Sequence, residues 1–362
     1  MPLEGSGRTV PGPQMMNLNG VEVSTIASQF KSKANLTLDP ERARRFVASA
    51  RDPASPVSSG NAGDTMPATD RIELALEAAV AAGETAGCPP KLAAAIRHGV
   101  FPGGARVRPR LVVAVARACG DDDPALTDAA AAAVELLHCA SLVHDDLPCF
   151  DDAPIRRGRP SVHQAFGERL AVLAGDALIV RAYQTLGLAG ARSPQRLARV
   201  MTTISNGVGM PFGIVAGQAW ECEPRVALSD YQRAKTGALF AASTAAGAEA
   251  AGGSADAWRS LGEWLGEAYQ VADDVRDVCA DIGLMGKPSG RDVALDRPSS
   301  ARQEGLVGAI QHFERLVACA VEAIPPCRGA ASLRALVRGE ADRLIPATMR
   351  TEALDAAGHA AA

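Results

Sequence analysis

The sequence predicts an all-α protein built as a single large helical bundle around a central cavity. Aromatic residues make up only 4% of the 362 residues, and runs of β-branched residues typical of strands are few. Segments such as DRIELALEAAVAAG, LTDAAAAAVELLHCASLV and QRLARVMTTISNGVG repeat their apolar residues with the period of a helix. Large helical enzymes reach this length as one unit, so we expect one main domain.

The N-terminal region differs in composition from the rest of the chain. Residues 1–65 are rich in Pro, Gly and Ser and have no sustained apolar period, although ERARR at 41–45 has weak helix potential. We expect a disordered extension here, with a functional arm as the alternative. We expect the folded domain to span 66–350, starting near Met66 with Thr69 or Asp70 as helix cap, and 351–362 to be a loose tail.

Charge and cysteine usage exclude several classes of protein. The net charge of −4 gives no basic footprint for nucleic acid. No window reaches the roughly 18 consecutive apolar residues of a membrane span. The eight cysteines are scattered without a CxxC pair. This pattern indicates reduced thiols in a cytoplasmic protein and argues against a zinc site.

The most informative segment is LVHDDLPCFDDAPIRRGRPSVH, residues 142–163. It groups four carboxylates and a pair of arginines, namely Asp145, Asp146, Asp151, Asp152, Arg156 and Arg157. Carboxylates this close repel one another unless a polyvalent cation lies among them, and hard oxygen ligands suit Mg²⁺. Guanidinium groups match the geometry of phosphate oxygens. The segment therefore predicts a site for a metal-bound diphosphate.

A second acidic cluster lies in EAYQVADDVRDV, residues 267–278. On a helix, Gln270, Asp273, Asp274 and Asp277 share one face, since they stand at i, i+3, i+4 and i+7. His138 and the first two aspartates of the first cluster have a similar spacing. We therefore expect two helices to direct carboxylates at each other across one cavity. The alternative is that both clusters are solvated helix ends.

Three further segments carry cations suited to phosphate. PGGARVRPRL at 102–111 places Arg106, Arg108 and Arg110 after two glycines, which let backbone approach a ligand closely. RAKTGALF contains Lys235 and Thr236. GKPSGRD at 286–292 supplies a further Lys and Arg in a glycine-containing loop. Each alone is a weak signal, because surface loops often carry basic residues.

Taken together and in order, these motifs resemble those of the trans-prenyltransferases, the polyprenyl diphosphate synthases. The first acidic segment is similar to the family's DDxxxxD followed by RRG, and DDVRD to its DDxxD. PGGARVRP, KTGALF and GKPSGRD resemble the family's GGKRxRP, KT and GKxxGKD segments. The resemblance covers about residues 75–345 and is nearest to bacterial geranylgeranyl diphosphate synthases of the carotenoid branch. It implies the isoprenoid synthase fold.

The resemblance assigns roles to individual residues. It implies metal ligands at Asp145, Asp151, Asp273 and Asp277. The residues implied to act in catalysis are Asp145, Asp146, Asp151, Asp273, Asp274 and Lys235. The residues implied to bind the allylic diphosphate are Arg156, Lys235, Thr236, Gln270, Lys287 and Arg291. Those implied to bind isopentenyl diphosphate are Arg108, His138 and Arg157.

The implied activity is head-to-tail condensation of isopentenyl diphosphate with allylic diphosphates. The implied cofactor is Mg²⁺, with three ions per active site, and the implied assembly is a homodimer. Product length depends on the cavity below the first acidic cluster, where the small residues Ala140 and Ser141 precede Asp145 by about one turn. In the family, an aromatic residue at the position of Ala140 favours a fifteen-carbon product, so Ala140 points to geranylgeranyl diphosphate.

Two positions depart from the family pattern. Ala105 replaces the lysine that follows GG, which removes a cation that Arg106 or Arg108 is expected to replace. Arg291 replaces the last lysine of GKxxGKD and keeps the charge with a different geometry.

Three alternatives remain open from the sequence. One is a farnesyl diphosphate synthase, and another is a class I terpene cyclase, whose second metal motif usually differs from DDxxD. The third is a non-catalytic partner subunit of a prenyltransferase. Such subunits tend to lose one acidic motif, whereas both are intact here.

Overall fold

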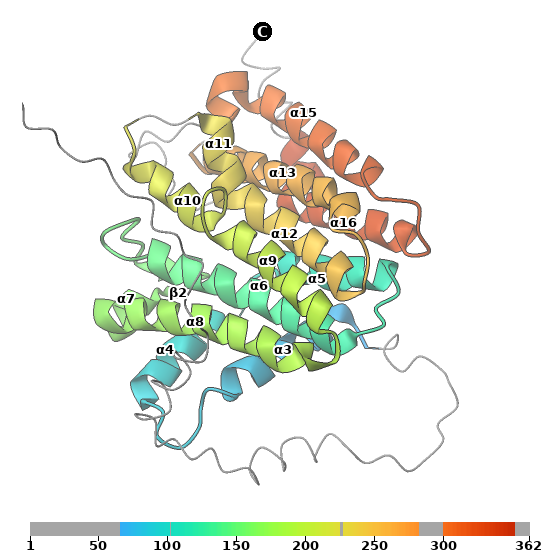
Figure 1. The fold of residues 1–362 in the computed structure, drawn as a ribbon. Helices are drawn as coiled ribbons and strands as arrows, with labels where there is room; N and C mark the ends of the chain where they lie inside the picture. Colours follow the sequence, from blue (N-terminus) through green and yellow to red (C-terminus); the bar gives the residue numbers. More distant parts are fainter. Residues whose placement is uncertain (1–65, 102, 225–226, 282–299, 352–362) are drawn as a thin grey trace, which may run out of the picture. The chain divides into compact units, whose positions relative to one another are not determined.

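The computed structural model describes residues 66–101, 103–224, 227–281 and 300–351 (Figure 1). These residues belong to one compact unit, Ala62–Ala362. The predicted extension at 1–65 and the tail beyond residue 351 lie outside the described part, so both stay predictions. Within it the all-α prediction is confirmed. The α-helices are α3 (Ala68–Ala81), α4 (Pro90–Val100), α5 (Val107–Ala118), α6 (Pro124–Asp145), α7 (Val162–Phe166), α8 (Glu168–Ala189), α9 (Pro194–Val208), α10 (Ile214–Ala219), α11 (Leu228–Gln232), α12 (Ala238–Ala250), α13 (Asp256–Asp281), α15 (Ser300–Glu322) and α16 (Ala330–Leu344).

Helix starts show where local sequence signals act. At the start of α6, the Asp123 carboxylate accepts a hydrogen bond from the backbone N–H of Leu126 at 3.4 Å, and Pro124 occupies the first turn, where its missing N–H is harmless. The predicted cap of α3 is wrong. The residue before α3 is Pro67, without a side-chain hydrogen bond, and Thr69 and Asp70 lie inside the first turn. Pro67 presets φ for helix entry, so no polar cap is needed to start the helix.

Helix α12 lies at the centre of the bundle. All of its residues from Leu239 to Ala250 are buried, and most are Ala, Ser, Thr or Gly. It packs against α5, α9 and α13. Small side chains let these neighbours come close: a β-carbon added at Gly247 would collide with the backbone of Val112 on α5, and one at Gly262 with that of Phe240.

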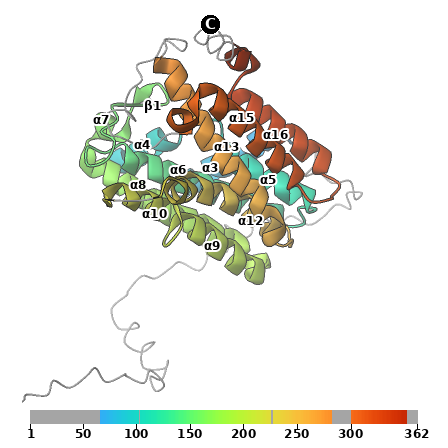
Figure 2. The same cartoon turned by 90° about the horizontal axis from the view of Figure 1, so that it is seen from above.

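The two long helices that carry the acidic clusters belong to different packed layers. Helix α6 packs on α8 and buries the main apolar cluster, which includes Leu136, Leu137 and Leu178. Helix α13 lies between α12 and α15, as both views show (Figures 1 and 2). Phe313 and Val275 belong to the apolar cluster between α13 and α15. Both carriers are therefore fixed by burial of apolar surface.

Among the described helices, α6 is long and apolar enough to cross a membrane by length and composition. However, 78% of its apolar window is buried inside the fold. Burial on this scale is what the core helix of a bundle shows.

The described part departs from the helical pattern at one hairpin that the sequence analysis did not predict. Strands β1 (Ile155–Arg156) and β2 (Arg159–Pro160) pair antiparallel, with Arg156 opposite Arg159. The two residues between them, Arg157 and Gly158, have φ values of 53° and 74°. Two left-handed residues in a two-residue loop are the signature of a tight hairpin turn, in which glycine is favoured and arginine is unusual.

Candidate active site

The first acidic motif lies where α6 ends and the chain folds back over its C-terminus. The backbone N–H of Asp151 donates to the carbonyl of Asp145 at 2.9 Å, and that of Ala153 donates to the carbonyl of Asp146 at 3.1 Å. These bonds satisfy carbonyls that the helix end leaves open. They also bring Asp151 beside Asp145, as the motif predicted.

Asp145 is directed toward a lysine from a distant part of the chain. Lys235 Nζ lies 3.7 Å from Asp145 Oδ1, an oxygen that is buried and has no hydrogen-bond partner in the described structure. Burial raises the pKa of Asp145 to about 6; Lys235 opposes this rise, whereas Asp151 and Glu221 add to it. A carboxylate that is buried and incompletely neutralised is suited to a further cation.

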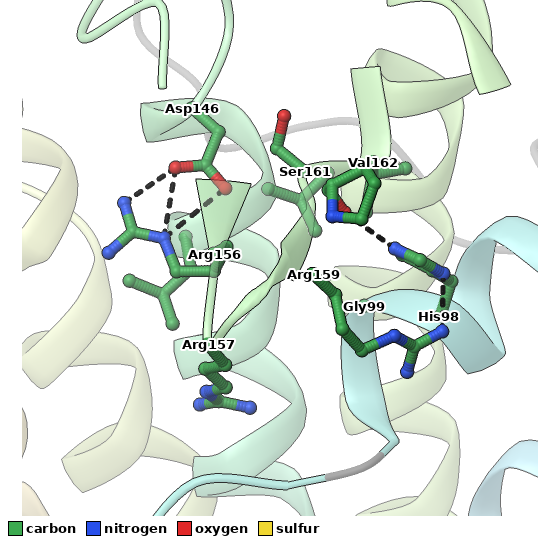
Figure 3. A pocket seen from close by; sticks show the side chains of 11 residues that line it. His98, Gly99, Asp146, Arg156, Arg157, Arg159, Ser161 and Val162 are labelled. Atoms are coloured by element: carbon green, nitrogen blue, oxygen red, sulfur yellow. Dashed lines mark hydrogen bonds and ion pairs between the residues drawn. The ribbon is translucent and has the colours of Figure 1, made fainter. Parts of the chain in front are cut away.

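Asp146 has a different environment from Asp145. It is 2% exposed, and Arg156 of β1 donates to its Oδ1 from Nη2 at 2.5 Å and from Nε at 3.0 Å. Burial raises the pKa of the Asp146 carboxyl, although Arg156 acts in the opposite direction. Figure 3 shows this pair at the edge of a small pocket between the hairpin, α4 and α6. The structure thus pairs two residues that the resemblance assigned to different ligands.

Lys235 and Thr236 lie in a π-helical turn, Arg233–Gly237, between α11 and α12. Wide turns of this kind interrupt the regular α-helix and are frequent at functional sites. Helix α10 packs against this turn so closely that a β-carbon at Gly217 would collide with the backbone of Lys235. Gly217 is therefore the residue that lets the two backbones meet and fixes the origin of the lysine side chain.

Glu221 is a site residue that the sequence analysis missed. Lys235 Nζ donates to its Oε1, Tyr231 Oη donates to the same oxygen at 2.5 Å, and Gln218 Nε2 donates to Oε2 at 3.0 Å. The sequence analysis had only a weak signal for it, because Glu221 stands in a short polar stretch far from both acidic motifs. Lys235 thus lies between the carboxylates of Glu221 and Asp145.

The second acidic motif joins the first through a chain of hydrogen bonds. Thr236 Oγ1 donates to Gln270 Oε1 at 2.8 Å, and Gln270 Nε2 donates to Asp274 Oδ1 at 3.2 Å. Asp274 is buried, whereas Asp273 is partly exposed and pairs with Arg276 one turn later. Because Thr236 follows Lys235, the two acidic helices do approach one site. The side chain of Asp277 lies outside the described part, as do Lys287 and Arg291.

Arg108 and His138 meet on the inner side of α5 and α6. Arg108 Nη1 lies 3.3 Å from His138 Nε2, and its guanidinium lies over the ring of Phe240, 4.4 Å from the centroid. Its Nε is buried without a partner in the described structure. Burial and the neighbouring arginines hold the pKa of His138 well below its usual range, so His138 is neutral and accepts the hydrogen bond of Arg108.

Arg106 does not fill the place of the missing lysine, which corrects one part of the expectation. It is 6% exposed and left-handed at φ 50°, and its guanidinium bonds to Glu73 Oε1 at 2.8 Å, Glu135 Oε1 at 2.6 Å and the carbonyl of Val100 at 2.9 Å. A guanidinium that already donates to three acceptors within the fold is not available to a ligand. Among the described residues that the motifs singled out, Arg108 and Arg157 remain as cations for a ligand near Ala105.

Arg157 occupies the tip of the hairpin and faces the glycine loop. Its Nη2 lies 3.9 Å from Glu135 Oε1, and a β-carbon at Gly104 would lie 3.0 Å from its Nε. Glu135 is thus shared by Arg106 and Arg157. The three residues implied for isopentenyl diphosphate therefore come from α5, α6 and the hairpin and gather around one buried carboxylate.

The two small residues predicted to set product length have different environments. Ser141 is partly exposed and shares the helix face of His138 and Asp145, and its Oγ donates to the His138 carbonyl at 2.8 Å. Ala140 is 1% exposed and belongs to the apolar core cluster of α6 and α8. One residue along a helix turns the side chain by about 100°. Only Ser141 lies on the face of the site.

The donor set fits a hard divalent cation that is completed by a ligand. Within the described residues, no three acidic, His or Cys side chains lie close enough together to form a metal site by themselves. Mg²⁺ is usually held by one or two carboxylates together with substrate phosphates and water, and the buried Oδ1 of Asp145, which accepts no hydrogen bond in the described structure, is suited to this role. Asp145, Asp151 and the second acidic helix are therefore suited to a metal that arrives with a diphosphate.

Comparison with known proteins decides the family. The polyprenyl synthetase family model matches residues 89–308, more than half of the chain. This chain belongs to the polyprenyl synthetase family. The family resemblance seen in the motifs is thereby confirmed. The match runs from α4 into α15 and so includes the described site residues.

Two curated relatives of this polyprenyl synthetase are geranylgeranyl diphosphate synthases. That of Cereibacter sphaeroides is 53% identical and covers 76% of this chain and 96% of its own length. The synthase of Rhodobacter capsulatus is 50% identical, and the alignment covers 77% of this chain and 97% of that relative. These shares mean that nearly the whole length of each relative aligns.

Solved structures confirm the isoprenoid synthase fold. A geranyltransferase from Legionella pneumophila superposes with a TM-score of 0.65 at 27% identity, covering 76% of this chain and 94% of its own. A geranyltransferase from Helicobacter pylori, solved with magnesium and isoprenyl diphosphate, superposes with a TM-score of 0.63 at 27% identity. The superposition covers 76% of this chain and 98% of that chain.

Proposed function

We propose that this polyprenyl synthetase condenses isopentenyl diphosphate head-to-tail with allylic diphosphates and releases mainly geranylgeranyl diphosphate. The observation that carries the proposal is the chain of contacts from Asp145 through Lys235 and Thr236 to Gln270 and Asp274. It joins both acidic motifs around one set of phosphate-binding groups. The 53% identity to a geranylgeranyl diphosphate synthase supports the product.

The allylic diphosphate is bound at the end of α6. Lys235 supplies a cation that is already positioned between two carboxylates, and Arg156 supplies a planar fork at the base of the hairpin. As the C–O bond of the allylic diphosphate breaks, negative charge develops on the leaving group, and cations fixed in advance stabilise it. Thr236 and Gln270 keep the second acidic helix in register with this cation. Lys287 and Arg291, which follow α13 in the sequence and lie outside the described residues, complete the proposed set.

Isopentenyl diphosphate is bound on the same face of α6, about two turns before the end of the helix, beside His138. Arg108 offers a buried Nε, His138 orients the guanidinium as a neutral acceptor, and Arg157 reaches in from the hairpin. Holding the diphosphate at this end directs the double bond toward the allylic carbon. Loss of a proton to the released diphosphate then restores an allylic product.

The allylic carbocation that forms when the C–O bond breaks has to be protected from water. The bundle interior beside the site is apolar: Leu239, Phe240 and Ala241 of α12 are all buried. When Mg²⁺ is bound at the proposed ligands Asp145, Asp151, Asp273 and Asp277, in a complement of three ions, it neutralises diphosphate charge and lowers the barrier to ionisation.

The product assay is the direct test. Purified enzyme with Mg²⁺, isopentenyl diphosphate and each allylic primer in turn should yield dephosphorylated products that are mainly twenty carbons long. A fifteen-carbon end product would instead make this a farnesyl diphosphate synthase. The absence of any turnover by the pure chain would indicate a non-catalytic partner subunit, and cyclised hydrocarbon would indicate a terpene cyclase.

We also propose that the enzyme is a homodimer in the cytoplasm that acts on isoprenoid precursors of carotenoids. Val172, Leu173, Val180 and Leu188 are exposed apolar side chains of α8, and a second copy would cover them. The cysteines are scattered in the sequence, and those of the described residues are unpaired, which supports a reducing compartment. Light scattering during gel filtration measures the assembly: Leu173→Glu should yield a monomer, whereas a wild-type monomer would contradict the dimer.

A further inference from the structure

The hairpin that carries Arg157 is too small to hold its own shape. Each strand has two residues, and a hairpin alone is marginal even when it is longer. Its turn also holds Arg157 in the left-handed region at φ 53°, which an arginine adopts at a cost. Contacts outside the hairpin must therefore set the position of Arg157.

The two arginines opposite each other in the hairpin supply these contacts on different sides. Arg156 turns toward Asp146 at the end of α6, whereas Arg159 turns toward His98 of α4 (Figure 3). In the proposed function Arg156 also binds the allylic diphosphate, so it serves a ligand as well as the hairpin. Arg159 is assigned no ligand, and its contacts are with α4 and the residue that follows it.

The contacts of Arg159 and His98 connect three segments. Arg159 Nη2 donates to His98 Nδ1 at 2.8 Å, and Nη1 donates to the carbonyl of Phe101 at 2.8 Å. An arginine only donates, so Nδ1 of His98 is the acceptor and its Nε2 carries the proton. That Nε2–H donates to the carbonyl of Pro160 at 2.7 Å. The His98 ring also packs edge-on against Phe166, with centroids 5.4 Å apart.

The segments joined in this way carry the two walls of one site. Phe101 leads into the loop of Gly103 and Gly104, and Arg157 lies against Gly104 on the other wall. The loop lacks the lysine that the family pattern has at Ala105, so the position of Arg157 relative to the loop matters more here. His98, bonded to both Arg159 and Pro160, keeps the two walls at a fixed separation.

We propose that Arg159 and His98 are positioning residues that hold the Arg157 hairpin against the Gly103–Gly104 loop and so set the affinity for isopentenyl diphosphate. The inference rests on the proposed function, since it takes isopentenyl diphosphate as the ligand of Arg157. It assigns neither residue a contact with substrate. Their effect is larger on isopentenyl diphosphate, because Lys235 and Thr236 come from a turn that neither Arg159 nor His98 contacts, and Arg156, the allylic ligand on the hairpin, has its own anchor in Asp146.

The test uses the full-length enzyme with Arg159→Gln, His98→Phe and the double variant. His98→Phe keeps an aromatic ring beside Phe166 and removes both ring nitrogens. Arg192→Gln, at an exposed arginine of the turn after α8, is the control for the same change of charge. KM for each substrate, kcat, the melting temperature and calorimetric binding of isopentenyl diphosphate alone are measured for all forms.

Arg159→Gln is expected to raise KM for isopentenyl diphosphate about tenfold or more and KM for the allylic substrate less than about twofold, because small displacements of a binding group have large effects. The double variant should match Arg159→Gln alone, since both changes break one unit. Equal rises in both KM values, an additive double variant, or wild-type binding by the variants would overturn the inference and leave the proposed function intact. If the wild type neither binds nor consumes isopentenyl diphosphate, the proposed function fails and the inference fails with it.

Discussion

Arg156 holds Asp146 through two nitrogens, Nη2 at 2.5 Å and Nε at 3.0 Å from Oδ1. The carboxylate is buried and the guanidinium is about one-third exposed, so the pair closes the end of α6 against the hairpin. Asp145, its neighbour in sequence, instead faces Lys235. Two consecutive aspartates thus have separate tasks: Asp146 fixes the hairpin, and Asp145 offers an oxygen for a cation.

Asp146→Asn should therefore lower stability as well as activity. It removes a charge-assisted pair and leaves Arg156 with a weaker acceptor, which should lower the free energy of unfolding by about 1–2 kcal/mol after allowance for solvent around Arg156. Urea denaturation measures it, with the exposed Asp70→Asn as control. A variant as stable as wild type would show that the pair adds nothing to the fold.

Asp273→Ala should abolish turnover without harming the fold. Asp273 is partly exposed and its described partner is Arg276 on the same helix, so its removal leaves no buried group unpaired. Loss of a ligand that opposes transition-state charge should lower kcat by about 10²–10³-fold. Glu263→Ala, an exposed acid on the same helix, should keep wild-type kcat. Near-normal turnover by a folded Asp273→Ala enzyme would remove Asp273 from the metal site.

Product length should respond to Ser141 more than to Ala140. Ser141→Phe places a ring on the face of His138 and Asp145, where it should block the longer tail and shift the product to fifteen carbons. Ala140→Tyr forces a ring into a packed core and should lower stability by about 1–3 kcal/mol. Chromatography of the dephosphorylated products measures the change in chain length, and thermal melts measure the change in stability, for each variant. A clean switch of product by Ala140→Tyr, with unchanged stability, would reverse the assignment.

Cys139 should be inert toward thiol reagents. Burial raises the pKa of its thiol to about 12, against about 8.5 for a free cysteine. At neutral pH almost no thiolate forms, so iodoacetamide should label the exposed Cys149 and Cys222 and leave Cys139 unmodified. Because the unfolded state ionises first, this thiol should lower stability as pH rises between about 9 and 12. Rapid labelling of Cys139 in peptide mass spectra would contradict its burial.

A chain that begins at Met66 should fold and work. The Met66 carbonyl accepts a hydrogen bond from Arg117 Nη2 at 2.8 Å, and α3 starts two residues later. Such a chain should melt at nearly the temperature of the full-length protein and keep its kcat. A fall of many degrees, or loss of turnover, would mean that residues 1–65 contribute to the fold or the site.

The sequence predicted the parts of the site that lie on regular helices. The period of apolar residues located α6 and α13, and helical spacing then grouped Gln270 with Asp274, which the hydrogen bonds bear out. The same rule placed Ala140 with Ser141, although their side chains diverge. Spacing gives the face of a helix only to within about 100°, and packing decides the rest.

The parts that could not be predicted depend on contacts between distant segments. Glu221 meets Lys235 only because Gly217 lets α10 lie on the π-helical turn. Arg106 has the sequence context of a phosphate ligand, but its guanidinium donates to Glu73 and Glu135, which are distant in the sequence. The hairpin could not be predicted, because strands of two residues are too short to show a periodic pattern in the sequence.

The crowded centre of the bundle also determines where movement takes place during a catalytic cycle. Helix α12 meets its neighbours almost backbone to backbone, so sliding it past α5 or α13 would drive main-chain atoms into one another. Such a centre behaves as a rigid frame. Adjustment to substrates of different length and charge then falls to the ends of α6 and α13 and to the short hairpin. In this enzyme, an incompressible core of alanine and glycine confines the working motions to its rim.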